Sequence, residues 1–504
     1  MIQGRNINIS RIRDDTPLVC DLSFTLNDGE KAVIIGEEGN GKSTLLRFIV
    51  DPTSIDGYVT YSGDMLLNGS KLGYLPQTLP QSDRDVLVSE YLNANGANQR
   101  KLAQLLDEVC LPADMLFQTR RMDTLSGGEK VKLQLVRVLL DEPDVLLLDE
   151  PTNDLDLGTL FWLEDFLCQC EQAVLFVSHD EMLIEKVAMM VIHLEQTPSK
   201  KECVNTVAHL PYTDYMEARR RAFDKQTQIA RKEKSQFDAK MERFRQLFER
   251  VQFEQRTISR GDPSGGRLLK KKMHTIKSMG ARFEKEKEKL TKLPVMEQPI
   301  FLTLPEVSIP RTKEIMRLDI DKLTVGERVL SKNIHLEVFG GEHIGIIGDN
   351  GVGKTTLLRR VDEELKKLNR LSHFYMPQDY MEKLPSDMTA VDFLAPNADK
   401  AAVTQARTTL GSVKFMREEM TCPVSRLSGG QRAKLLFLKF ALERYSVLVL
   451  DEPTRNLSPL SNPVIRNILE DYDGAIISVS HDRKYLAQVC DKLFRLTKDG
   501  LEQQ

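Results

Sequence analysis

The sequence lacks any apolar run long enough to cross a membrane. No stretch approaches the roughly 18 consecutive apolar residues that mark a transmembrane helix. The first ten residues, MIQGRNINIS, also lack the apolar core of a signal peptide. We therefore expect a cytoplasmic protein that does not insert into membranes.

Cysteine is also scarce. The chain has seven cysteines, and no two of them form a CxxC pair. This scattered spacing argues against a zinc or iron–sulfur site, and it favours the reduced thiols of a cytosol. The seven are Cys20, Cys110, Cys168, Cys170, Cys203, Cys422 and Cys490.

Four motifs, by contrast, occur twice and in the same order. Three of the pairs are 302 residues apart and the fourth is 312 residues apart. The period is that of a whole domain, so we infer a tandem duplication. The pairs are GEEGNGKST with GDNGVGKTT, LSGGEK with LSGGQR, VLLLDEPTN with VLVLDEPTR, and VSHDE with VSHDR.

Each copy has the pattern of an α/β domain. Short apolar runs of strand length, such as Val145–Asp149 and Ala173–Ser178, are typical of parallel strands that are buried on both faces. Helical spacing follows at Thr44–Val50 and Thr356–Val361. We expect two parallel sheets covered by helices.

The first motif, G-x-x-x-x-G-K-[ST], predicts a phosphate-binding loop in each copy. Its glycines allow backbone N–H groups to point at phosphate oxygens, and its lysine reaches the terminal phosphates. Its hydroxyl residue, Ser43 or Thr355, is a hard ligand for Mg²⁺, and the helix that follows directs its positive end at the anion. The predicted ATP-binding residues are Gly36, Glu37, Glu38, Gly39, Asn40, Gly41, Lys42, Ser43 and Thr44, and Gly348, Asp349, Asn350, Gly351, Val352, Gly353, Lys354, Thr355 and Thr356.

Paired carboxylates follow a buried strand in each copy. Asp149 and Asp451 are placed to hold Mg²⁺, and the adjacent Glu150 and Glu452 to polarise an attacking water. Alone, each pair would be better explained as a turn or a helix cap; beside a phosphate loop it is not. A second strand in each copy ends at a histidine that could contact a γ-phosphate, namely His179 and His481.

The LSGG motif opens a predicted helix in each copy. A serine and two glycines at a helix start can bind an anion, although they could also be a simple helix cap. The economical arrangement is a sandwich in which the phosphate loop of one copy faces this turn of the other. The residues are Ser126, Gly127 and Gly128, and Ser428, Gly429 and Gly430.

Together these motifs resemble the ATP-binding cassette superfamily. The resemblance implies two tandem cassettes that bind ATP and Mg²⁺ and hydrolyse ATP. It adds Gln77 in YLPQ and Gln378 in YMPQ as glutamines near Mg²⁺ and the attacking water. It implies composite sites that pair Gly36–Ser43 with Ser428–Gly430, and Gly348–Thr355 with Ser126–Gly128.

Two cassettes on one chain, with a charged helical linker, resemble the ABC-F subfamily. Members of that subfamily bind the ribosome near the tRNA exit site, and their linker reaches toward the P-site tRNA and the peptidyl-transferase centre. Some regulate translation and others displace antibiotics. The implied domains are a first cassette at 1–196, a helical hairpin linker at 197–312 and a second cassette at 313–504, paired within one monomer.

Some positions depart from the family pattern. Asp154 stands where histidine is usual. Ser458 stands where the first copy has Asp156, so the two ATP sites are expected to fire unequally. No aromatic occupies the usual adenine-stacking places, which hold Ile12–Arg13 and Val325–Gly326. The first cassette has no sizeable insertion after Gln77, so we expect the arm of some relatives to be short or missing.

The middle section carries a strong positive charge. Tyr212–Leu293 contains 23 basic and 12 acidic residues, a net charge of +11, which leaves −15 for the rest of the chain. Apolar residues recur at coiled-coil spacing in two seams on either side of TISRGDPSGGR, at 257–267. We expect an antiparallel hairpin with a basic tip. The seams are Phe237, Met241, Phe244, Phe248 and Val251, and Leu269, Met273, Ile276, Met279, Phe283 and Leu290.

The basic tip is a candidate for binding ribosomal RNA and tRNA through phosphates, although a solvated spacer is the alternative. His274 and Phe253 could stack on an unpaired base, but Phe253 is better placed to pack within the hairpin. A transporter ATPase with a separate membrane subunit is the second functional hypothesis, and a DNA-linked ATPase is the third. The candidate RNA contacts are Arg256, Arg260, Arg267, Lys270, Lys271 and Lys272.

Overall fold

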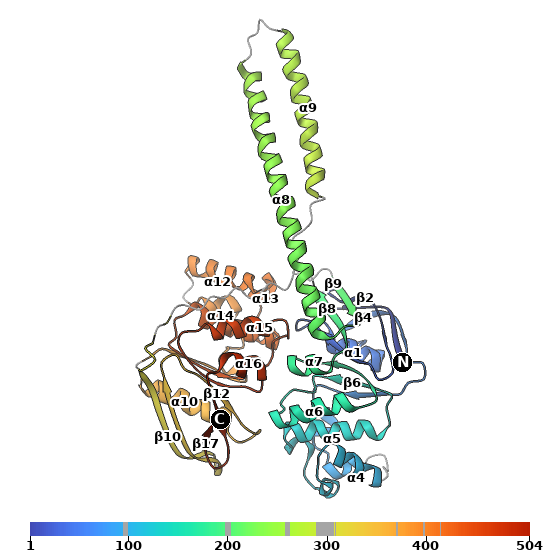
Figure 1. Ribbon diagram of the computed structural model, residues 1–504, viewed down its shortest axis with the longest axis vertical. Coiled ribbons are helices and arrows are strands. Elements are labelled where there is room, and N and C mark those ends of the chain that lie inside the picture. Colours follow the sequence, from blue (N-terminus) through green and yellow to red (C-terminus); the bar gives the residue numbers. More distant parts are fainter. Residues whose placement is uncertain are drawn as a thin grey trace. The chain divides into compact units, whose positions relative to one another are not determined.

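The computed structural model describes residues 1–93, 99–196, 203–257, 263–288, 307, 309–368, 371–396, 399–413 and 415–504. These residues form two compact units. The first unit joins Met1–Tyr212 to Gln298–Gln504 and contains both copies of the repeat. The second unit, Thr213–Glu297, contains the basic middle section (Figure 1).

The first cassette is built on two sheets. A three-stranded antiparallel sheet has the order β2-β1-β4, and a six-stranded sheet has the order β5-β6-β7-β3-β8-β9, in which only β9 is antiparallel to its neighbour. The strands are β1 (Ile2–Arg11), β2 (Pro17–Leu26), β3 (Lys31–Ile35), β4 (Val59–Leu66), β5 (Leu72–Leu75), β6 (Val145–Asp149), β7 (Ala173–Val177), β8 (Met190–Gln196) and β9 (Cys203–Ala208).

The second cassette repeats this plan. Its six-stranded sheet has the order β13-β14-β15-β12-β16-β17, with β17 antiparallel at the edge, and a two-stranded sheet pairs β10 with β11. The strands are β10 (Glu314–Val325), β11 (Arg328–Phe339), β12 (His343–Ile347), β13 (His373–Met376), β14 (Val447–Asp451), β15 (Ala475–Val479), β16 (Lys492–Leu496) and β17 (Leu501–Gln503).

Most of the helices also correspond between the copies. The first cassette has α1 (Lys42–Val50), α2 (Gln81–Arg84), α3 (Val88–Asn93), α4 (Gln99–Glu108), α5 (Gly127–Leu140), α6 (Leu157–Gln169) and α7 (Glu181–Val187). The second has α10 (Lys354–Leu368), α11 (Ala390–Leu394), α12 (Lys400–Ser412), α13 (Arg417–Thr421), α14 (Gly429–Leu442), α15 (Asn462–Glu470) and α16 (Arg483–Val489). The exceptions are α2 and α13. Short 3₁₀ turns lie at Pro52–Ile55, Ala113–Phe117, Met122–Thr124, Tyr380–Glu382 and Val424–Arg426.

The apolar runs of the sequence form the centre of each six-stranded sheet. Strands β3, β6 and β7 are buried at every residue, and so are their counterparts β12, β14 and β15. Burial on both faces explains why these strands are continuously apolar instead of alternating. Because parallel strands end at the same edge, the motif residues that follow them meet there.

The first cassette extends past residue 196, where we expected it to end. Strand β9 pairs with β8 along the edge of the six-stranded sheet, in a register from Val191–Ala208 to Gln196–Cys203. The second unit begins only at Thr213. The edge strand has only six residues, and none of them is fully buried.

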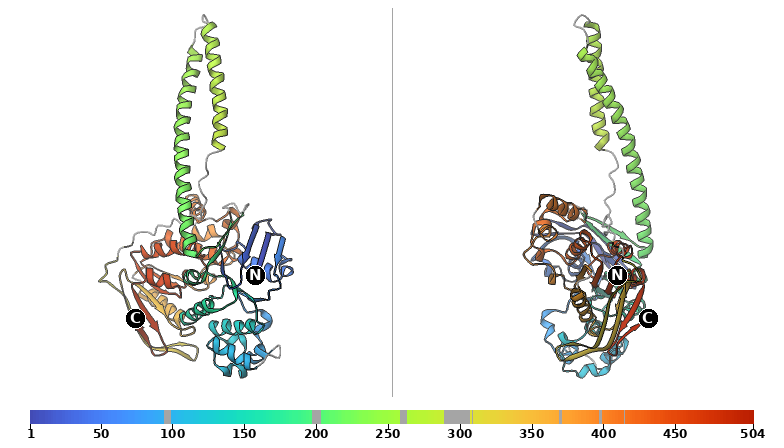
Figure 2. Two further views of the ribbon diagram at one scale, coloured as in Figure 1. Left: turned by 45° about the vertical axis from the view of Figure 1, so that its right-hand side comes forward. Right: turned by 90° about the vertical axis from the view of Figure 1, so that its left-hand side faces the viewer.

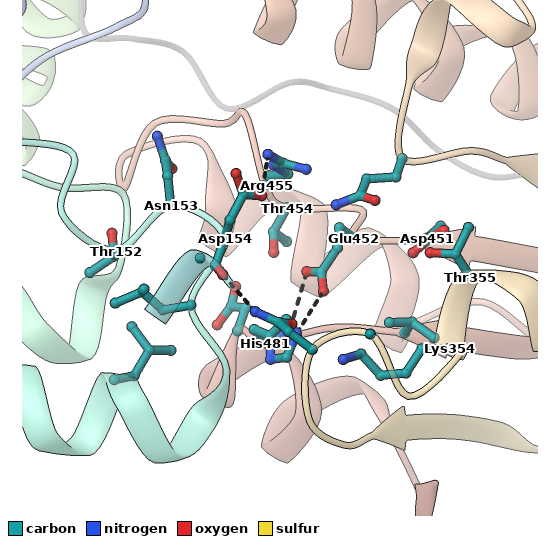
Figure 3. Close-up of a pocket in the computed structure, with 18 of the residues that line it drawn as sticks. Thr152, Asn153, Asp154, Lys354, Thr355, Asp451, Glu452, Thr454, Arg455 and His481 are labelled. Atoms are coloured by element: carbon teal, nitrogen blue, oxygen red, sulfur yellow. Dashed lines mark hydrogen bonds and ion pairs between the residues drawn. The ribbon is translucent and has the colours of Figure 1, made fainter. Parts of the chain in front are cut away.

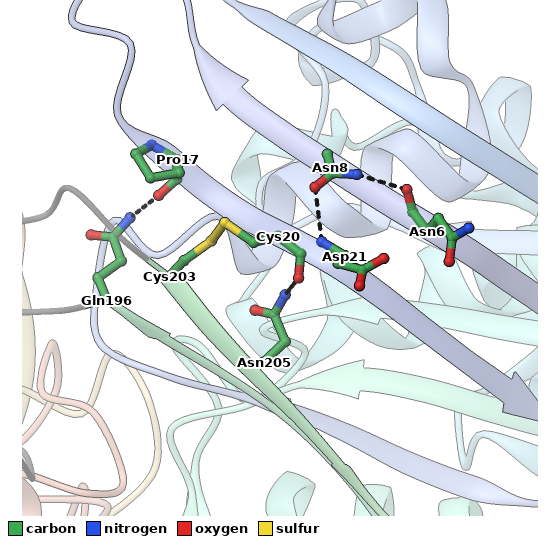
Figure 4. Close-up of a disulfide and its surroundings, with 8 residues drawn as sticks. All are labelled: Asn6, Asn8, Pro17, Cys20, Asp21, Gln196, Cys203 and Asn205. Atoms are coloured by element: carbon green, nitrogen blue, oxygen red, sulfur yellow. Dashed lines mark hydrogen bonds between the residues drawn. A yellow bond between two sulfur atoms is a disulfide. The ribbon is translucent and has the colours of Figure 1, made fainter. Parts of the chain in front are cut away.

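The expectation of reduced thiols is wrong for two of the seven cysteines. Cys20 on β2 and Cys203 at the start of β9 form a disulfide, with Cα atoms 5.9 Å apart (Figure 4). This separation is within the usual range of about 4.4–6.8 Å. Beside the bond, the Asn205 side-chain amide donates a hydrogen bond to the Cys20 carbonyl at 2.5 Å. The two cysteines are 183 residues apart, so only the pairing of β9 with the sheet brings them together.

The middle section is a hairpin of two long helices, α8 (Tyr212–Thr257) and α9 (Pro263–Glu288). The two lie side by side in both views of Figure 2. Tyr212–Thr257 contains neither glycine nor proline, which allows 46 helical residues without a break. At 1.5 Å per residue, α8 is about 70 Å long.

The predicted apolar seams face each other in this hairpin. Val251, Leu269 and Ile276 are buried, and they pack with three half-buried residues, Phe244, Phe248 and Met273. Phe283 makes edge contacts with Phe237 and Phe244. Leu290 lies outside the described residues.

The stretch between the two helices is shorter than the predicted tip at 257–267. Helix α9 begins at Pro263, so Gly265 and Gly266 lie in its first turn. Proline is well tolerated there, because the first N–H groups of a helix need no partner within it. Arg260 lies outside the described residues, whereas the other five predicted RNA contacts are exposed. The prediction that Phe253 packs within the hairpin is wrong, because its side chain is 68% exposed.

Candidate functional site

The two phosphate loops have the backbone that their glycines predict. Gly36, Gly39 and Gly41 adopt φ angles of 152°, 81° and 87°, and Gly348 and Gly353 adopt 153° and 108°. Side chains with a Cβ atom rarely adopt these angles. The helix that follows each loop begins at the motif lysine.

Each motif lysine folds back over its own loop. Lys42 Nζ donates to the Gly36 carbonyl at 2.9 Å, and Lys354 Nζ donates to the Gly348 carbonyl at 2.7 Å. Both lysines are almost fully buried. Burial lowers the pKa of Lys354, and this is only partly offset by nearby carboxylates, first of all that of Glu452.

The hydroxyl residue of each loop meets the carboxylate of the neighbouring strand. Ser43 Oγ donates to Asp149 Oδ1 at 2.8 Å, and Thr355 makes the corresponding bond to Asp451. Asp451 keeps a second buried oxygen without a hydrogen-bond partner. Burial raises the pKa of both aspartates.

These oxygen groups fit Mg²⁺. A hydroxyl and a carboxylate of this kind supply two hard ligands, and Mg²⁺ takes the remaining ones from phosphate and water. Among the described residues, no group of three or more His, Cys, Asp and Glu side chains could hold a metal by itself. Gln77 and Gln378 line the same cavities.

The predicted catalytic glutamates adjoin the histidines in both cassettes. Glu150 Oε1 lies 3.0 Å from His179 Nε2, and Glu452 Oε1 lies 3.6 Å from His481 Nε2. The backbone N–H of His481 also donates to Glu452 at 3.2 Å. Glu150 and both histidines each keep one buried polar atom without a partner.

The two glutamates differ in electrostatic environment. Burial raises the pKa of Glu150, but the charge and hydrogen bond of His179 outweigh it and leave that pKa below its ordinary value. Burial, with the Asp451 charge added, raises the pKa of Glu452 to about 8. Burial also lowers the pKa of His481 to about 4, and Lys354 adds to this effect. The two cassettes are therefore electrostatically unequal.

The serine of each LSGG turn caps the helix that follows. Ser126 Oγ accepts from the Glu129 N–H at 3.2 Å, and Ser428 Oγ accepts from the Gln431 N–H at 3.2 Å. The second turn also holds an anion, since the Gly430 N–H donates to Glu38 Oε2 at 2.5 Å. Glu38 belongs to the phosphate loop of the other cassette.

Two cavities lie where the cassettes meet. The first cavity, of about 710 Å³, is lined by the first phosphate loop together with Ser428 and Gly429. The second cavity, of about 690 Å³, is lined by the second phosphate loop together with Gly127 and Lys130 (Figure 3). The structure thus brings together the groups that the resemblance paired.

Ser458, which stands where the first copy has Asp156, is followed by a helix that begins later and is shorter. In the first copy, Asp156 Oδ1 accepts from the Thr159 N–H at 2.8 Å and caps α6, which begins at the next residue. Ser458 bonds instead to Ser461 at 3.1 Å. Helix α15 begins only at Asn462 and has 9 residues, against 13 in α6.

Tyr58 and Arg455 are among the cavity residues that the sequence did not predict. Tyr58 lines the first cavity, and its carbonyl accepts a hydrogen bond from the N–H of Ile12 at 3.0 Å. Tyr58 lies in a turn that is well separated from Ile12 in the sequence, so only the fold brings the two residues together. Arg455 lines the second cavity; the departure of VLVLDEPTR from VLLLDEPTN was its signal. None of the described residues lining the second cavity is Phe, Tyr or Trp.

Comparison with known proteins identifies the class. A model of the family described as "ABC transporter" matches residues 19–153 and 331–455, which together exceed half of the chain. The chain therefore belongs to the ABC transporter family. The fold class expected from the sequence, two tandem α/β cassettes joined by a helical hairpin, is confirmed.

Within that family, the chain is an ATP-hydrolysing tandem cassette of the ABC-F type. It is 25% identical to ABC transporter F family member 2 of Arabidopsis thaliana, over 98% of this chain and 76% of that protein. It is 26% identical to the ATP-binding protein Uup of a Buchnera aphidicola strain, over 95% and 78%. The match to YdiF of Bacillus subtilis, at 29% identity, covers 76% of this chain and 56% of that protein.

Solved structures share the fold. An archaeal ribosome recycling factor, solved with a ribosomal stalk protein, matches with a TM-score of 0.59 and 16% identity over 99% of this chain and 90% of that one. An RNase-L inhibitor matches with a TM-score of 0.59 and 17% identity over 98% and 89%. Among the described residues, no helix has both the length and the hydropathy that spanning a membrane requires.

Proposed function

We propose that this chain is a cytoplasmic translation factor that binds the ribosome near the tRNA exit site. Its hairpin reaches toward the P-site tRNA and the peptidyl-transferase centre, where it acts in ordinary translation or protects the ribosome against an antibiotic. The observation that carries the proposal is the hairpin itself, a second compact unit with its own apolar seam. Two cassettes need no such element in order to hydrolyse ATP.

The charge of the hairpin supports an RNA partner. Arg256, Arg267 and Lys270–Lys272 are exposed near the end where α8 turns into α9, and cations there neutralise phosphates without reading sequence. Phe253 is exposed beside them, and an exposed aromatic ring can stack on an unpaired base. Elsewhere the chain is acidic, so phosphate repels it and the hairpin decides the orientation.

The relatives support the same proposal. The F family members named above resemble this chain over nearly its whole length. The structural neighbours include a recycling factor of the ribosome and a protein described in a ribosome-bound complex. At 16–17% identity these neighbours supply the fold alone, so the partner rests on the hairpin and the F family resemblance.

We assign the ATP chemistry to the residues that line the two cavities. Lys42 and Lys354 bind the terminal phosphates, and the N–H groups of the opposite serine–glycine turn bind the same phosphates from the other cassette. Mg²⁺, held by Ser43 with Asp149 and by Thr355 with Asp451, neutralises phosphate charge when it is bound.

Glu150 and Glu452 orient the attacking water and accept its proton. His179 and His481 lie within reach of the glutamates and hold the γ-phosphate side of each site. ATP that contacts both cassettes binds the closed arrangement better than the open one, and this difference in affinity is what drives closure. Hydrolysis removes this difference in affinity, and the protein is then released from the ribosome.

The partner is tested by removing charge from the hairpin end. In one variant, Arg256, Arg267, Lys270, Lys271 and Lys272 are all changed to Gln. A matched control changes five exposed cations nearer the start of α8, namely Lys225, Arg231, Lys232, Lys234 and Arg243, to Gln. Binding to purified ribosomes is measured by co-sedimentation with ATP at two salt concentrations.

We expect the first variant to lose at least tenfold in affinity and to show a weaker salt dependence than the parent, because it releases fewer counterions. The control should lose much less. Equal losses would mean that positive charge anywhere on the hairpin contributes to binding, and that its end makes no particular contact with the ribosome. Sedimentation of the parent with membranes instead of ribosomes would favour the ATPase subunit of a transporter.

A further inference from the structure

The two cassettes carry opposite charges at equivalent positions. In the 302-residue offset of the repeat, Glu164 on α6 corresponds to Arg466 on α15, and Glu181 on α7 corresponds to Arg483 on α16. All four side chains are at most 11% exposed. At both pairs of equivalent positions the sign of the charge is reversed between the copies, acidic in the first cassette and basic in the second.

Each carboxylate pairs across the two cassettes. Arg466 donates to Glu181 through both terminal nitrogens, at 2.7 and 3.1 Å. Arg483 donates to Glu164, and also to Asp180 at 3.4 Å. The second contact is the repeat image of the first, because 181 pairs with 466 as 483 pairs with 164. The interface is therefore two-fold in position and opposite in charge.

A neighbouring cation of the second cassette also contacts carboxylates of the first. Lys484, which corresponds to Met182 of the first copy, donates to Glu181 at 3.1 Å and to Glu185 at 2.5 Å. The Arg483 guanidinium also lies 5.0 Å from the centre of the Phe161 ring. At these positions the first cassette thus presents carboxylates and the second presents cations. Lys186 of the first cassette also contacts Glu164 at 3.3 Å, and Asp482 of the second cassette lies 3.8 Å from Arg466. We call these contacts the charge seam, defined by Glu164, Glu181, Arg466 and Arg483.

Pairing like cassettes would place like charges in contact. Two first cassettes in the same arrangement would bury Glu164 against Glu181 twice, and two second cassettes would bury Arg466 against Arg483. Buried charges of one sign in direct contact repel each other and are unfavourable. Repulsion of this kind makes an interface specific, because it disfavours the wrong partner.

We propose that the charge seam is the surface by which each cassette selects its partner, and that the partner is a cassette of the opposite charge. In one chain, this selects pairing of the first cassette with the second and disfavours assembly of two chains through like cassettes. The proposal goes beyond ribosome binding and holds whatever the hairpin contacts.

The seam also sets the register of the nucleotide cavities. Glu181 and Arg483 each follow a predicted catalytic histidine by two residues and begin the helix after it. A seam that holds these helix starts together holds His179 and His481 in place across the interface. Loss of the seam should therefore lower kcat as well as raise the KM for ATP.

The test uses three variants of the full chain. The acidic variant carries Arg466→Glu and Arg483→Glu, the basic variant carries Glu164→Arg and Glu181→Arg, and the swapped variant carries all four changes. A control carries Arg121→Glu and Arg360→Glu, which reverse exposed cations, one in each cassette. Each is assayed for ATP hydrolysis and for mass in solution, and the acidic and basic variants are also co-expressed.

We expect the acidic and basic variants each to lose at least tenfold in ATP hydrolysis. The swapped variant should return to within about threefold of the parent. Co-expression should give a 1:1 dimer of the acidic and basic chains that hydrolyses ATP, since each acidic cassette then finds a basic one. The control should keep the parent activity.

The proposal is overturned if the acidic and basic variants remain as active as the parent. It is also overturned if a folded swapped variant shows no recovery, or if the co-expressed chains do not associate. Should either double variant fail to fold alone, the co-expressed pair and the swapped variant still decide the question. None of these results depends on ribosome binding.

Discussion

At the scale of single residues, Glu150 and Glu452 share an unusual backbone. Their φ angles are 52° and 53°, a region that side chains with a Cβ atom rarely adopt. Each is fixed there by a hydrogen bond from its N–H to the end of the next strand, to Val177 and Val479. Strain of this kind persists only where the surroundings determine it, and it is concentrated at functional sites.

Arg455 makes the second cavity different from the first. Its side chain donates to Asp154 Oδ1 at 2.6 Å across the cassettes, and both positions depart from the repeated or usual residue. The Asp154 carbonyl also accepts from Asn350 of the second phosphate loop at 2.6 Å. The pair therefore ties the first cassette to the second cavity.

We predict that Arg455→Asn lowers the rate of ATP hydrolysis about three- to fivefold. The two side chains are 30% and 58% exposed, and a partly exposed ion pair of this kind contributes at most ~1 kcal/mol. Asp154→Asn should have a similar effect, and the double variant should be no slower than either single one. Fully additive losses in kcat would show that the two residues act separately.

Many of these residues could be predicted from the sequence because they repeat. The glycines, lysines and carboxylates stand at fixed offsets, and each type has one clear chemical use. Tyr58 and the Cys20–Cys203 disulfide could not be predicted, since both depend on which distant strands become neighbours. The ion pair of Arg455 required the cassette interface, which no local pattern contains.

At the scale of elements, the hairpin is stabilised by a narrow apolar seam. Among the described residues, its buried cluster consists of Val251, Leu269 and Ile276 with three half-buried neighbours. The aromatic contacts of Phe283 and an ion pair between Lys240 and Glu286 at 2.5 Å lie beside it. The heptad-like spacing predicted this packing, and the lack of glycine and proline allows α8 to extend to Thr257. Helix length there depends on the absence of helix breakers.

We predict that Ile276→Asp separates the two helices. Placing a carboxylate among apolar side chains costs about 3 kcal/mol or more, which exceeds what so small a cluster offers. Limited trypsin digestion should cut the variant within 212–288 at least tenfold faster than the parent, while ATP hydrolysis is unchanged because the cassettes form a separate unit. Thr275→Asp, which adds the same charge at an exposed position, is the control. Equal digestion of the two variants would contradict this account of the hairpin.

At the scale of the whole molecule, the chain divides its charge by function. The hairpin region is strongly basic, whereas the rest of the chain is acidic. Within that acidic part, the charge seam places Glu164 and Glu181 of the first cassette against Arg466 and Arg483 of the second. The tandem arrangement could be predicted from the repeat alone. The seam could not, because two isolated charge reversals in a repeat have no meaning until the interface is known.

The central claim is that ATP held between the cassettes controls contact with the ribosome. The most direct measurement is co-sedimentation of the Glu150→Gln, Glu452→Gln double variant with purified ribosomes, in ATP and in ADP. We predict that the variant hydrolyses ATP at least a hundredfold more slowly and stays bound to ribosomes in ATP but not in ADP. Equal binding in both nucleotides, or no binding in either, would contradict the claim.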